Sequence, residues 1–333
     1  MKKLLEIYSR FIKSKFYFFY SKYSASFPIY IWIKRLTDNI PLCLILEILF
    51  FPGGGIYFYI SLLIKKILPR VNNELWCICC IRNEKQYLKE WIEYYKLHNI
   101  DKIVFYDCST DGSKEIIDPY IKQGFVKYHS NGVRRQTNAY NNSLFRYARR
   151  GRYFAFIDID EFLRPLTCTT VKEEFFITFS QIKAKYPKLV GLNICWRFFG
   201  TSNIEKNSND LVIKRFVYRA NDDFGDNRLS KVIVDSSKAI SFTNPHMPQV
   251  IYKYVFTDCD GNITTKPFLD KVCYSHLVNH HYFLKSKEEF FLKKNRGTAS
   301  GRGKRLDSDL IRYDKNDVYD DSMLIYVDKI NGV

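Results

Sequence analysis

A regular alternation of apolar strands and amphipathic helices between residues 75 and 157 restricts the fold of this chain more than any other feature. Strands are predicted at 75–81, 102–106, 125–128 and 153–157, and helices at 84–97, from 113 onward and at 136–149. The first helix places Leu88, Trp91, Ile92 and Tyr95 on one face, as helical periodicity requires. Short links between such units predict a mostly parallel sheet flanked by helices, with right-handed crossovers, and hence an α/β fold.

The last of these strands ends abruptly at three carboxylates. Residues 153–157 have no polar break, and Asp158, Asp160 and Glu161 follow almost at once. Ligands of open α/β sheets bind beyond the carboxyl ends of the strands, so these side chains are expected at a binding edge. In an extended Asp-Ile-Asp both aspartates lie on one side, with Ile159 turned toward the core, which suits Mg²⁺ or Mn²⁺. The alternative is that the aspartates only cap the next element.

Polar turns follow the first two predicted strands as well. Their polar residues are Arg82, Asn83, Glu84, Asp107, Ser109 and Asp111. Because parallel strands share one carboxyl edge, three loops are expected to converge on one rim, which favours a ligand site. The alternatives are that Asn83 and Gln86 form a capping pair at a helix N-terminus and that residues 107–112 are only a tight turn.

Composition narrows the class of partner. The chain has 333 residues, of which 46% are hydrophobic and 17% aromatic, so we expect one main globular domain with appendages. A net charge of +17 indicates an acidic partner, namely nucleic acid, anionic lipid or a phosphorylated substrate. Zinc-finger spacing, RNP-like motifs and basic heptads are lacking in the sequence, so nucleic-acid binding is the weakest of these. The nine cysteines have no regular spacing and are interpreted as reduced, buried thiols.

The N-terminal segment 1–70 combines basic, aromatic and apolar residues. Its apolar stretch 40–64 is interrupted by Glu47 and by the Pro-Gly-Gly-Gly at 52–55, so two interfacial helices fit better than one spanning helix. We expect docking on an anionic membrane surface, on the cytoplasmic inner face, because no cleavable signal is seen and the thiols are reduced. The alternatives are a helical subdomain packed on the core and an anchored enzyme of the Golgi lumen.

The chain after residue 165 is less regular. A donor-binding half is expected at 71–165 and an acceptor half at 166–298, with a hairpin of 250–256 turned by 258–262. The charged tail 299–333 is expected to fray.

Several motifs together resemble glycosyltransferase family 92 over about residues 75–297. They are Arg-Asn-Glu-x-x-Tyr-Leu-x-Glu-Trp-Ile-x-Tyr-Tyr at 82–95, Tyr-Asp-Cys-Ser-Thr-Asp at 106–111, Gln136 with 139–141, Phe-Ile-Asp-Ile-Asp-Glu-Phe-Leu-x-Pro at 156–165, Trp-Arg-x-Phe-Gly-Thr-Ser at 196–202 and a His-Tyr block at 281–297. The resemblance implies a GT-A fold, a nucleotide-sugar donor, a divalent metal and inversion at the anomeric carbon.

The resemblance also implies roles for single residues. Asp107 would contact the nucleobase, and Asp158 and Asp160 would hold Mn²⁺ or Mg²⁺ on the donor diphosphate. The residues expected to bind the donor are Arg82, Asn83, Glu84, Asp107, Ser109, Asp111, Gln136, Asp158, Lys285 and Arg296. A cation such as Lys285 or Arg296 can neutralise charge on the leaving diphosphate.

The third metal ligand and the base are less constrained. His281 aligns with the His-Tyr pair of the family and is a candidate third ligand, the alternative being a hydrogen-bonded core histidine. An inverting transfer needs a base on the acceptor hydroxyl. Candidates are Asp222 and Asp226 in a glycine-containing loop, and Glu161 beside the metal motif, while the bland interpretation of the loop is a solvated acidic turn.

The sequence therefore predicts a metal-dependent enzyme that moves a hexose to a saccharide or glycolipid acceptor in cell-surface polysaccharide biosynthesis. The alternatives are a non-catalytic carbohydrate- or lipid-binding protein on the same fold and, less favoured, a basic nucleic-acid-binding protein.

Overall fold

The computed structural model describes residues 67–130, 136–250, 254–296 and 305–332. The segment 1–70 predicted to contact a membrane lies almost wholly outside these residues. Within the described ranges, no helix is both long and apolar enough to cross a membrane.

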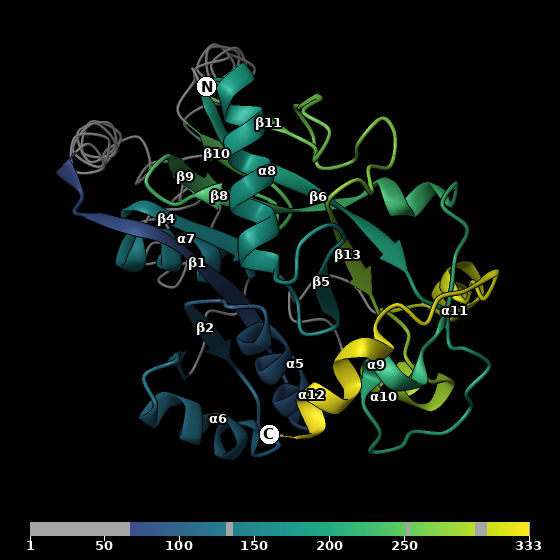
Figure 1. Ribbon diagram of the computed structural model, residues 1–333. Coiled ribbons are helices and arrows are strands. Elements are labelled where there is room, and N and C mark those ends of the chain that lie inside the picture. Colours follow the sequence, from purple (N-terminus) through teal and green to yellow (C-terminus); the bar gives the residue numbers. More distant parts are fainter. Residues whose placement is uncertain (1–66, 131–135, 251–253, 297–304, 333) are drawn as a thin grey trace, which may run out of the picture.

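Four parallel strands form one side of the central sheet (Figure 1). They are β1 (Arg70–Ile81), β2 (Lys102–Asp107), β3 (Val126–His129) and β4 (Arg150–Phe156). β1 lies between β2 and β4, and β3 pairs with the outer edge of β2. The four strands expected from the sequence, and their parallel arrangement, are therefore confirmed.

The other side of the sheet is mixed. Its strands are β5 (Glu161–Pro165), β6 (Leu189–Phe198), β8 (Ser230–Asp235), β11 (Val255–Thr257), β12 (Ile263–Thr264) and β13 (Leu277–His281). β8 runs antiparallel between β4 and β6, so it brings residues far along the chain next to the strand that ends at Asp158. β13 pairs with β5 and with β6, which places His281 opposite Glu161.

The expected hairpin with its turn at 258–262 is present and joins β11 to β12, and β11 also pairs with β6 in the main sheet. Its first strand begins later than expected, at Val255. Val250 ends a different strand, β10 (Pro248–Val250), which pairs with β9 (Ala239–Phe242) in a separate ribbon, and residues 251–253 lie outside the described residues.

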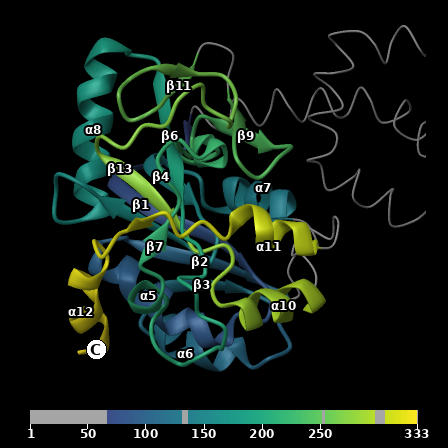
Figure 2. The same ribbon diagram turned by 90° about the vertical axis from the view of Figure 1, so that its right-hand side faces the viewer.

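Both faces of the sheet are buried by helices. On β1, Leu75 and Cys77 belong to one apolar core, and Trp76 and Ile78 belong to the other. The first core packs under α5 (Lys85–Leu97), α6 (Ser113–Lys122) and α8 (Val171–Lys185), and the second under α7 (Gln136–Tyr147). Figure 2 shows α7 and α8 on opposite faces. Burial on both faces explains why these strands read as continuous apolar runs.

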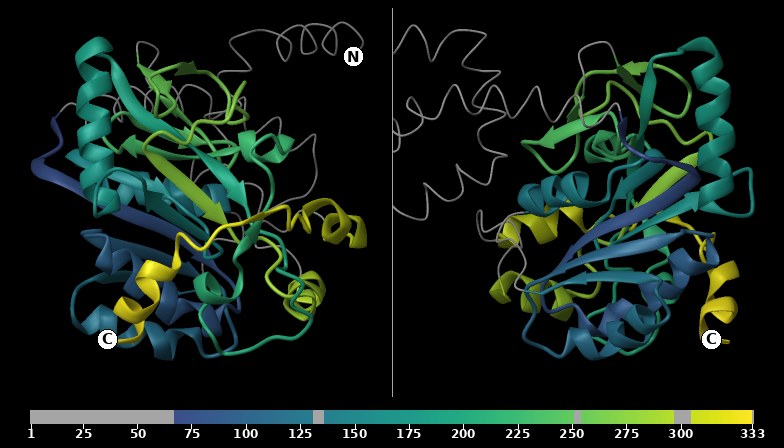
Figure 3. Two further views of the ribbon diagram at one scale, coloured as in Figure 1. Left: turned by 45° about the vertical axis from the view of Figure 1, so that its right-hand side comes forward. Right: turned by 90° about the vertical axis from the view of Figure 1, so that its left-hand side faces the viewer.

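α10 (Lys287–Arg296) precedes the tail that was expected to fray. Residues 299–304 of that tail lie outside the described residues, and residues 305–332 are folded, contrary to expectation. They form α11 (Asp307–Tyr313), β14 (Val318–Tyr319), η2 (Leu324–Tyr326) and α12 (Val327–Asn331). β14 pairs with β7 (Tyr218–Arg219), which follows α9 (Val212–Arg215) and precedes η1 (Gly225–Arg228). Tyr326 packs edge-on against Tyr94 of α5. These few apolar anchors hold the polar tail on the domain, and in both views of Figure 3 the yellow C-terminal helix lies beside the blue part of the chain.

Candidate active site

Three loops meet at the carboxyl edge of the parallel strands, as expected. Ile81 at the end of β1 pairs with Asp107 at the end of β2, and Ile157 donates its backbone N–H to Ile78 on β1. The turns at 82–84, 107–111 and 158–161 therefore share one rim, where ligands of such sheets bind.

The Asp158–Glu161 segment is a turn, so the expected extended form is wrong. The Glu161 N–H donates to the Asp158 carbonyl at 3.1 Å, and the Trp91 indole N–H on α5 donates to the same carbonyl at 3.1 Å and to that of Glu161 at 3.0 Å. Ile159 is buried in the core, as expected. Because the chain turns here, the two aspartates meet different partners.

Asp158 is held by groups from α7 and β8. The Gln136 amide donates to Asp158 Oδ1 at 2.5 Å, and the Lys231 ammonium lies 2.7 Å from Oδ2. Lys231 also lies 3.7 Å from Glu161, whose other contact is the Asp158 N–H at 2.9 Å. Each carboxylate oxygen of Asp158 therefore accepts a hydrogen bond from a protein side chain.

A buried charge network results. The side chains of Lys231 and Glu161 are 1% and 0% exposed. Burial disfavours the Lys231 ammonium, yet Asp158 and Glu161 hold the pKa of Lys231 above its ordinary value. Burial raises the pKa of Glu161 to about 8, and Lys231 only partly opposes this rise. Glu161 therefore lies beneath the rim with no exposed atom, where it orients Asp158.

Asp160 faces the C-terminal half of the chain. Its carboxylate pairs with Lys293 on α10 and lies 3.7 Å from His281 Nε2, while its carbonyl accepts the Tyr282 N–H at 2.8 Å. Burial opposes ionisation, but the Lys293 ammonium holds the pKa of Asp160 well below its usual range. Burial lowers the pKa of His281 to about 3, so its ring is neutral at pH 7.

Asp160 and His281 together fit a divalent metal. An ionised carboxylate and a neutral imidazole are ligands that Mn²⁺ accepts, and phosphate oxygens and water commonly complete such a site. The second ring nitrogen of His281, Nδ1, is buried without a partner among the described residues. Both predicted aspartate ligands have protein partners, Asp158 in Gln136 and Lys231 and Asp160 in Lys293, and the Asp158 side chain is the more exposed of the two.

Four cations surround this pair. Lys285, Lys293, Arg296 and Arg305 lie near Asp160 or Glu84, and Arg296 donates to the Glu84 carboxylate at 2.5 Å and to the Asn83 carbonyl. Burial and the neighbouring cations lower the pKa of Lys293 to about 8. Such crowding of like charge is costly unless an anion also binds.

Several buried polar atoms near these cations have no hydrogen-bond partner among the described residues. Within the residues that the structure covers, the buried atoms without a partner include Glu84 Oε2, Arg296 Nε, and Arg305 Nε and Nη1. Buried polar groups are nearly always hydrogen-bonded, so these atoms mark a place where a polar ligand is expected.

The turn after β2 is pre-arranged by side chains. Asn83, with φ of 53°, accepts the Thr110 N–H at 2.7 Å, and its own N–H donates to Ser109 Oγ at 2.7 Å. Asp107 accepts the Ser109 N–H at 2.7 Å and the Tyr128 hydroxyl at 2.9 Å. The predicted residues of the first two loops are thus in mutual contact.

The remaining predicted residues of this rim lie around that turn. Asp111 accepts the Lys85 N–H at 3.0 Å and so joins the second loop to the start of α5. Burial raises the pKa of the Cys108 thiol, and the nearby Arg82 opposes the rise, which places Arg82 beside Cys108.

Aromatic rings lie between His281 and the 222–226 loop that holds the candidate bases. Asp222 is 51% exposed and lies 2.9 Å from Arg219, and Asp226 accepts two hydrogen bonds from Arg312 at 2.8 Å. Phe224 between them packs on Phe198, which packs on His281. The loop is thus linked to His281 through ring contacts.

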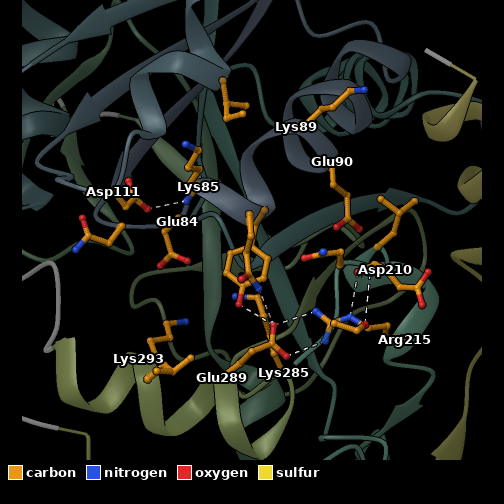
Figure 4. Close-up of a pocket in the computed structure, with 18 of the residues that line it drawn as sticks. Glu84, Lys85, Lys89, Glu90, Asp111, Asp210, Arg215, Lys285, Glu289 and Lys293 are labelled. Atoms are coloured by element: carbon orange, nitrogen blue, oxygen red, sulfur yellow. Dashed lines mark hydrogen bonds and ion pairs between the residues drawn. The ribbon is translucent and has the colours of Figure 1, made fainter. Parts of the chain in front are cut away.

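A cavity of about 770 Å³ adjoins the rim (Figure 4). Its residues nearest the rim are Asn83, Glu84, Lys285, Lys293 and Arg296. In Figure 4, Glu84 and Lys293 lie on one side of it, and Asp210 and Arg215 on the other. Gln136 and Lys231, whose side chains bind Asp158, are not among its lining residues.

Sequence reasoning missed Lys231, Lys293 and Arg305 as site residues. Lys231 had a signal, because a single lysine inside the apolar strand at 230–235 needs a buried partner. Lys293 lay in the His-Tyr block without an assigned role. Arg305 gave no signal, since it stands in a charged stretch that was expected to fray.

A second group of ligand-type atoms lies elsewhere. Asp258, Asp260 and Cys273 offer atoms within 4.8 Å of one another, beside the hairpin of β11 and β12. Asp258, however, accepts the N–H groups of Asp260 and Asn262 and the Asn262 amide, so the turn itself uses its oxygens. This group carries no sign of a ligand beyond proximity.

The chain is similar over about half its length to several solved structures. No match was found among curated proteins. Among solved structures, S. aureus TarS is 12% identical, with 49% of this chain and 28% of TarS covered and a TM-score of 0.33. The mannosyltransferase PcManGT from Pyrobaculum calidifontis, in complex with GDP-Man and Mn²⁺, is 14% identical, with 46% of each chain covered and a TM-score of 0.29. HddC from Yersinia pseudotuberculosis is 11% identical, with 55% and 90% covered and a TM-score of 0.30.

These structural likenesses are partial, and the chain spans less than a third of TarS. The sequence match is more extensive: residues 74–302 match glycosyltransferase family 92. That span contains Asp158, Asp160 and His281, and it agrees with the resemblance found in the motifs. The chain belongs to glycosyltransferase family 92.

Proposed function

We propose that this enzyme transfers a hexose from a nucleotide sugar to a saccharide or glycolipid acceptor, with inversion, on a GT-A fold and with a divalent metal. The observation that carries the proposal is the pair of Asp160, in the turn after β4, and His281, at the end of β13, with Lys285, Lys293 and Arg305 near Asp160 and several unpartnered buried atoms nearby. A carboxylate–imidazole pair suits Mn²⁺, and clustered cations suit a diphosphate.

Each part of the rim has a role in this proposal. Asp107 and Asn83 would bind the nucleoside, and Lys285, Lys293 and Arg296 the diphosphate. When bound, the metal supplies charge neutralisation on the departing diphosphate. Lys231, Gln136 and Glu161 keep Asp158 in place, so that the rim is formed before the donor arrives.

The base remains assigned to the 222–226 loop. Asp222 is the stronger candidate, because Arg312 engages both oxygens of Asp226. Asp222→Asn is expected to lower transfer by about 10²–10⁴-fold with donor affinity unchanged, as loss of a general base does. Asp226→Asn is the matched control, and rates of Asp222→Asn within threefold of wild type would remove Asp222 from consideration.

The proposal is tested by thermal unfolding of the full chain with a panel of nucleotide sugars, with and without Mn²⁺. A true donor raises the melting temperature more with Mn²⁺ than without it, because ligand binding stabilises the native state. If no nucleotide sugar or nucleoside diphosphate raises it under either condition, the donor assignment fails.

A further inference from the structure

A cluster of arginines lies at the end of the parallel strands opposite the rim. β4 begins at Arg150, which pairs with Arg70 at the start of β1. Arg149 directly precedes β4, and Arg146 lies in the last turn of α7. Among the residues that the structure describes, none of these four side chains forms an ion pair. We call Arg70, Arg146, Arg149 and Arg150 the arginine patch.

Hydrogen bonds hold the segments that carry the patch side by side. Arg150 donates its backbone N–H to the Pro69 carbonyl at 3.0 Å and its Nε–H to the Leu68 carbonyl at 2.7 Å. Arg152 donates to the carbonyl of Tyr147 at 2.6 Å, which fastens the end of α7 to β4. Four positive charges therefore lie on adjoining segments without a counter-charge from the described residues. An external anion stabilises such a cluster.

Two large apolar side chains are exposed beside the arginine patch. Phe145, in the last turn of α7, is 75% exposed, and Ile67, ahead of β1, is 77% exposed. Proteins dock on anionic bilayers with this composition, because the apolar groups enter the interface while basic side chains bind lipid phosphates. The chemistry of this surface therefore fits a bilayer that carries anionic lipid.

The charge of the preceding chain argues for the same occupant. Residues 1–66 lie outside the described residues, and their sequence has eight lysines and two arginines against two glutamates and one aspartate. A basic segment is a poor occupant for the arginine patch, since like charges repel, and two copies joined patch to patch would repel in the same way. An anionic surface complements both the patch and the preceding segment.

The position of the patch leaves the rim accessible. Gln136, at the start of α7, donates to Asp158, whereas Phe145 lies nine residues further along the helix, a rise of about 14 Å. In Figure 1, α7 and the purple start of β1 lie on the left, and α10 and α11 lie on the right. A surface bound through the patch would therefore leave the rim uncovered.

We propose that the arginine patch, together with Phe145 and Ile67, docks the protein on the anionic face of a lipid bilayer. The proposal extends the membrane contact expected for the segment 1–70 to α7 and the start of β4. It does not rest on the proposed function, because it involves neither a sugar donor nor a metal.

The first test measures binding of the full chain to lipid vesicles by co-sedimentation. The vesicles contain phosphatidylcholine alone, or phosphatidylcholine mixed equally with phosphatidylglycerol. The variant is Arg70→Glu/Arg146→Glu, because neither side chain forms a hydrogen bond or ion pair with a described residue and the melting temperature should not change. Lys122→Glu/Lys329→Glu is the matched control, with the same change of charge at two exposed lysines on α6 and α12.

The wild type should bind the phosphatidylglycerol vesicles far more tightly than phosphatidylcholine alone, and added salt should weaken this binding. Each arginine near an anionic surface contributes about fivefold in affinity, so the patch variant should bind on the order of thirtyfold more weakly or worse. The control should stay within about threefold of wild type, as expected for charges remote from the lipid.

Three results would overturn the docking surface. They are wild type that does not bind phosphatidylglycerol vesicles, a patch variant that binds like wild type, and equal losses in the patch variant and the control. A duplex DNA oligomer in the same buffer is the comparison ligand. If wild type bound DNA more tightly than these vesicles, and the patch variant lost that binding, the patch would belong to a nucleic-acid site instead.

A second test locates the contact. Phe145→Trp places a fluorescent ring in the proposed interface, and Ile311→Trp places one on α11, where Ile311 is 78% exposed. After subtraction of the wild-type spectrum, emission of Phe145→Trp should shift to the blue on phosphatidylglycerol vesicles, and that of Ile311→Trp should not. A shift in Ile311→Trp alone would show docking through α11 and overturn the proposal.

Discussion

The rim around Asp160 and the hairpin around Asp258 both gather ligand-type atoms, but they differ in what surrounds them. At the hairpin, three such atoms lie within 4.8 Å, yet Asp258 is saturated by the backbone of its own turn. At the rim, the carboxylate of Asp160 contacts side chains from distant segments, Lys293 and His281, and nearby buried atoms have no partner in the described residues.

The difference shows that proximity of ligand atoms is weak evidence for a site. An aspartate that closes a turn has used its lone pairs locally, as aspartates in turns commonly do. A buried carboxylate that is paired with a lysine from another element does not serve its own turn. Where unpartnered polar atoms lie beside it, a bound ligand is the expected partner. The following predictions test this distinction, beginning with the largest effect.

Lys231→Met should be the most damaging change at the rim. It leaves Asp158 without its buried cation, and breaking a buried ion pair costs about 3–5 kcal/mol. Chemical denaturation should therefore show a large loss in the free energy of unfolding.

Lys214→Met, at an exposed pair with Asp210, is the control for Lys231→Met and should cost about 0–1 kcal/mol. Equal losses for the two lysines would mean that Lys231 has no special role in holding the rim.

Glu289, like Asp258, accepts several hydrogen bonds from protein groups. The stabilisation that ionised Glu289 contributes should make the free energy of unfolding depend on pH. Burial opposes ionisation, but the bonds from Arg215, Ser286 and Tyr87 lower the pKa of Glu289 to about 2. Because the folded pKa is below the unfolded value of about 4.3, its stabilisation is present above the unfolded pKa and is lost as pH falls toward 2.

Glu289→Gln should accordingly be less stable than wild type by on the order of 3 kcal/mol at pH 6, and the gap should shrink between pH 5 and 2. Urea unfolding across this range measures it. A gap that stays constant with pH would show that lost packing, not ionisation, is responsible.

The smallest effect is expected at the hairpin. Asp258→Asn keeps the acceptor for two backbone N–H groups and loses only the bond from the Asn262 amide, so it should cost about 1 kcal/mol. Transfer activity should be unchanged. A loss of activity without a larger loss of stability would mean that the hairpin takes part in the reaction.

The parallel half of the fold could be predicted because its signals are local. The first three strands of this half are each followed by a helix with its own periodicity, so the convergence of Asn83, Asp107 and Asp158 follows from parallel pairing. His281 was found through its motif.

The partners of the aspartates could not be predicted, because they depend on long-range pairing. Lys231 reaches Asp158 only because β8 enters the sheet antiparallel to β4, and Lys293 reaches Asp160 only after α10 has packed. The turn at 158–161 is fixed by Trp91 of α5, which an isolated Asp-x-Asp cannot reveal. Arg305 lies in a stretch whose polarity gave no indication of docking.

The most direct test of the central claim is calorimetric titration of Mn²⁺ into the full chain with UDP and, separately, with GDP. Three proteins are compared: wild type, Asp160→Asn and Asp258→Asn. We predict that wild type and Asp258→Asn bind the metal with a nucleotide present and that Asp160→Asn does not. Binding that survives in Asp160→Asn and disappears in Asp258→Asn would place the metal at the hairpin and contradict this account.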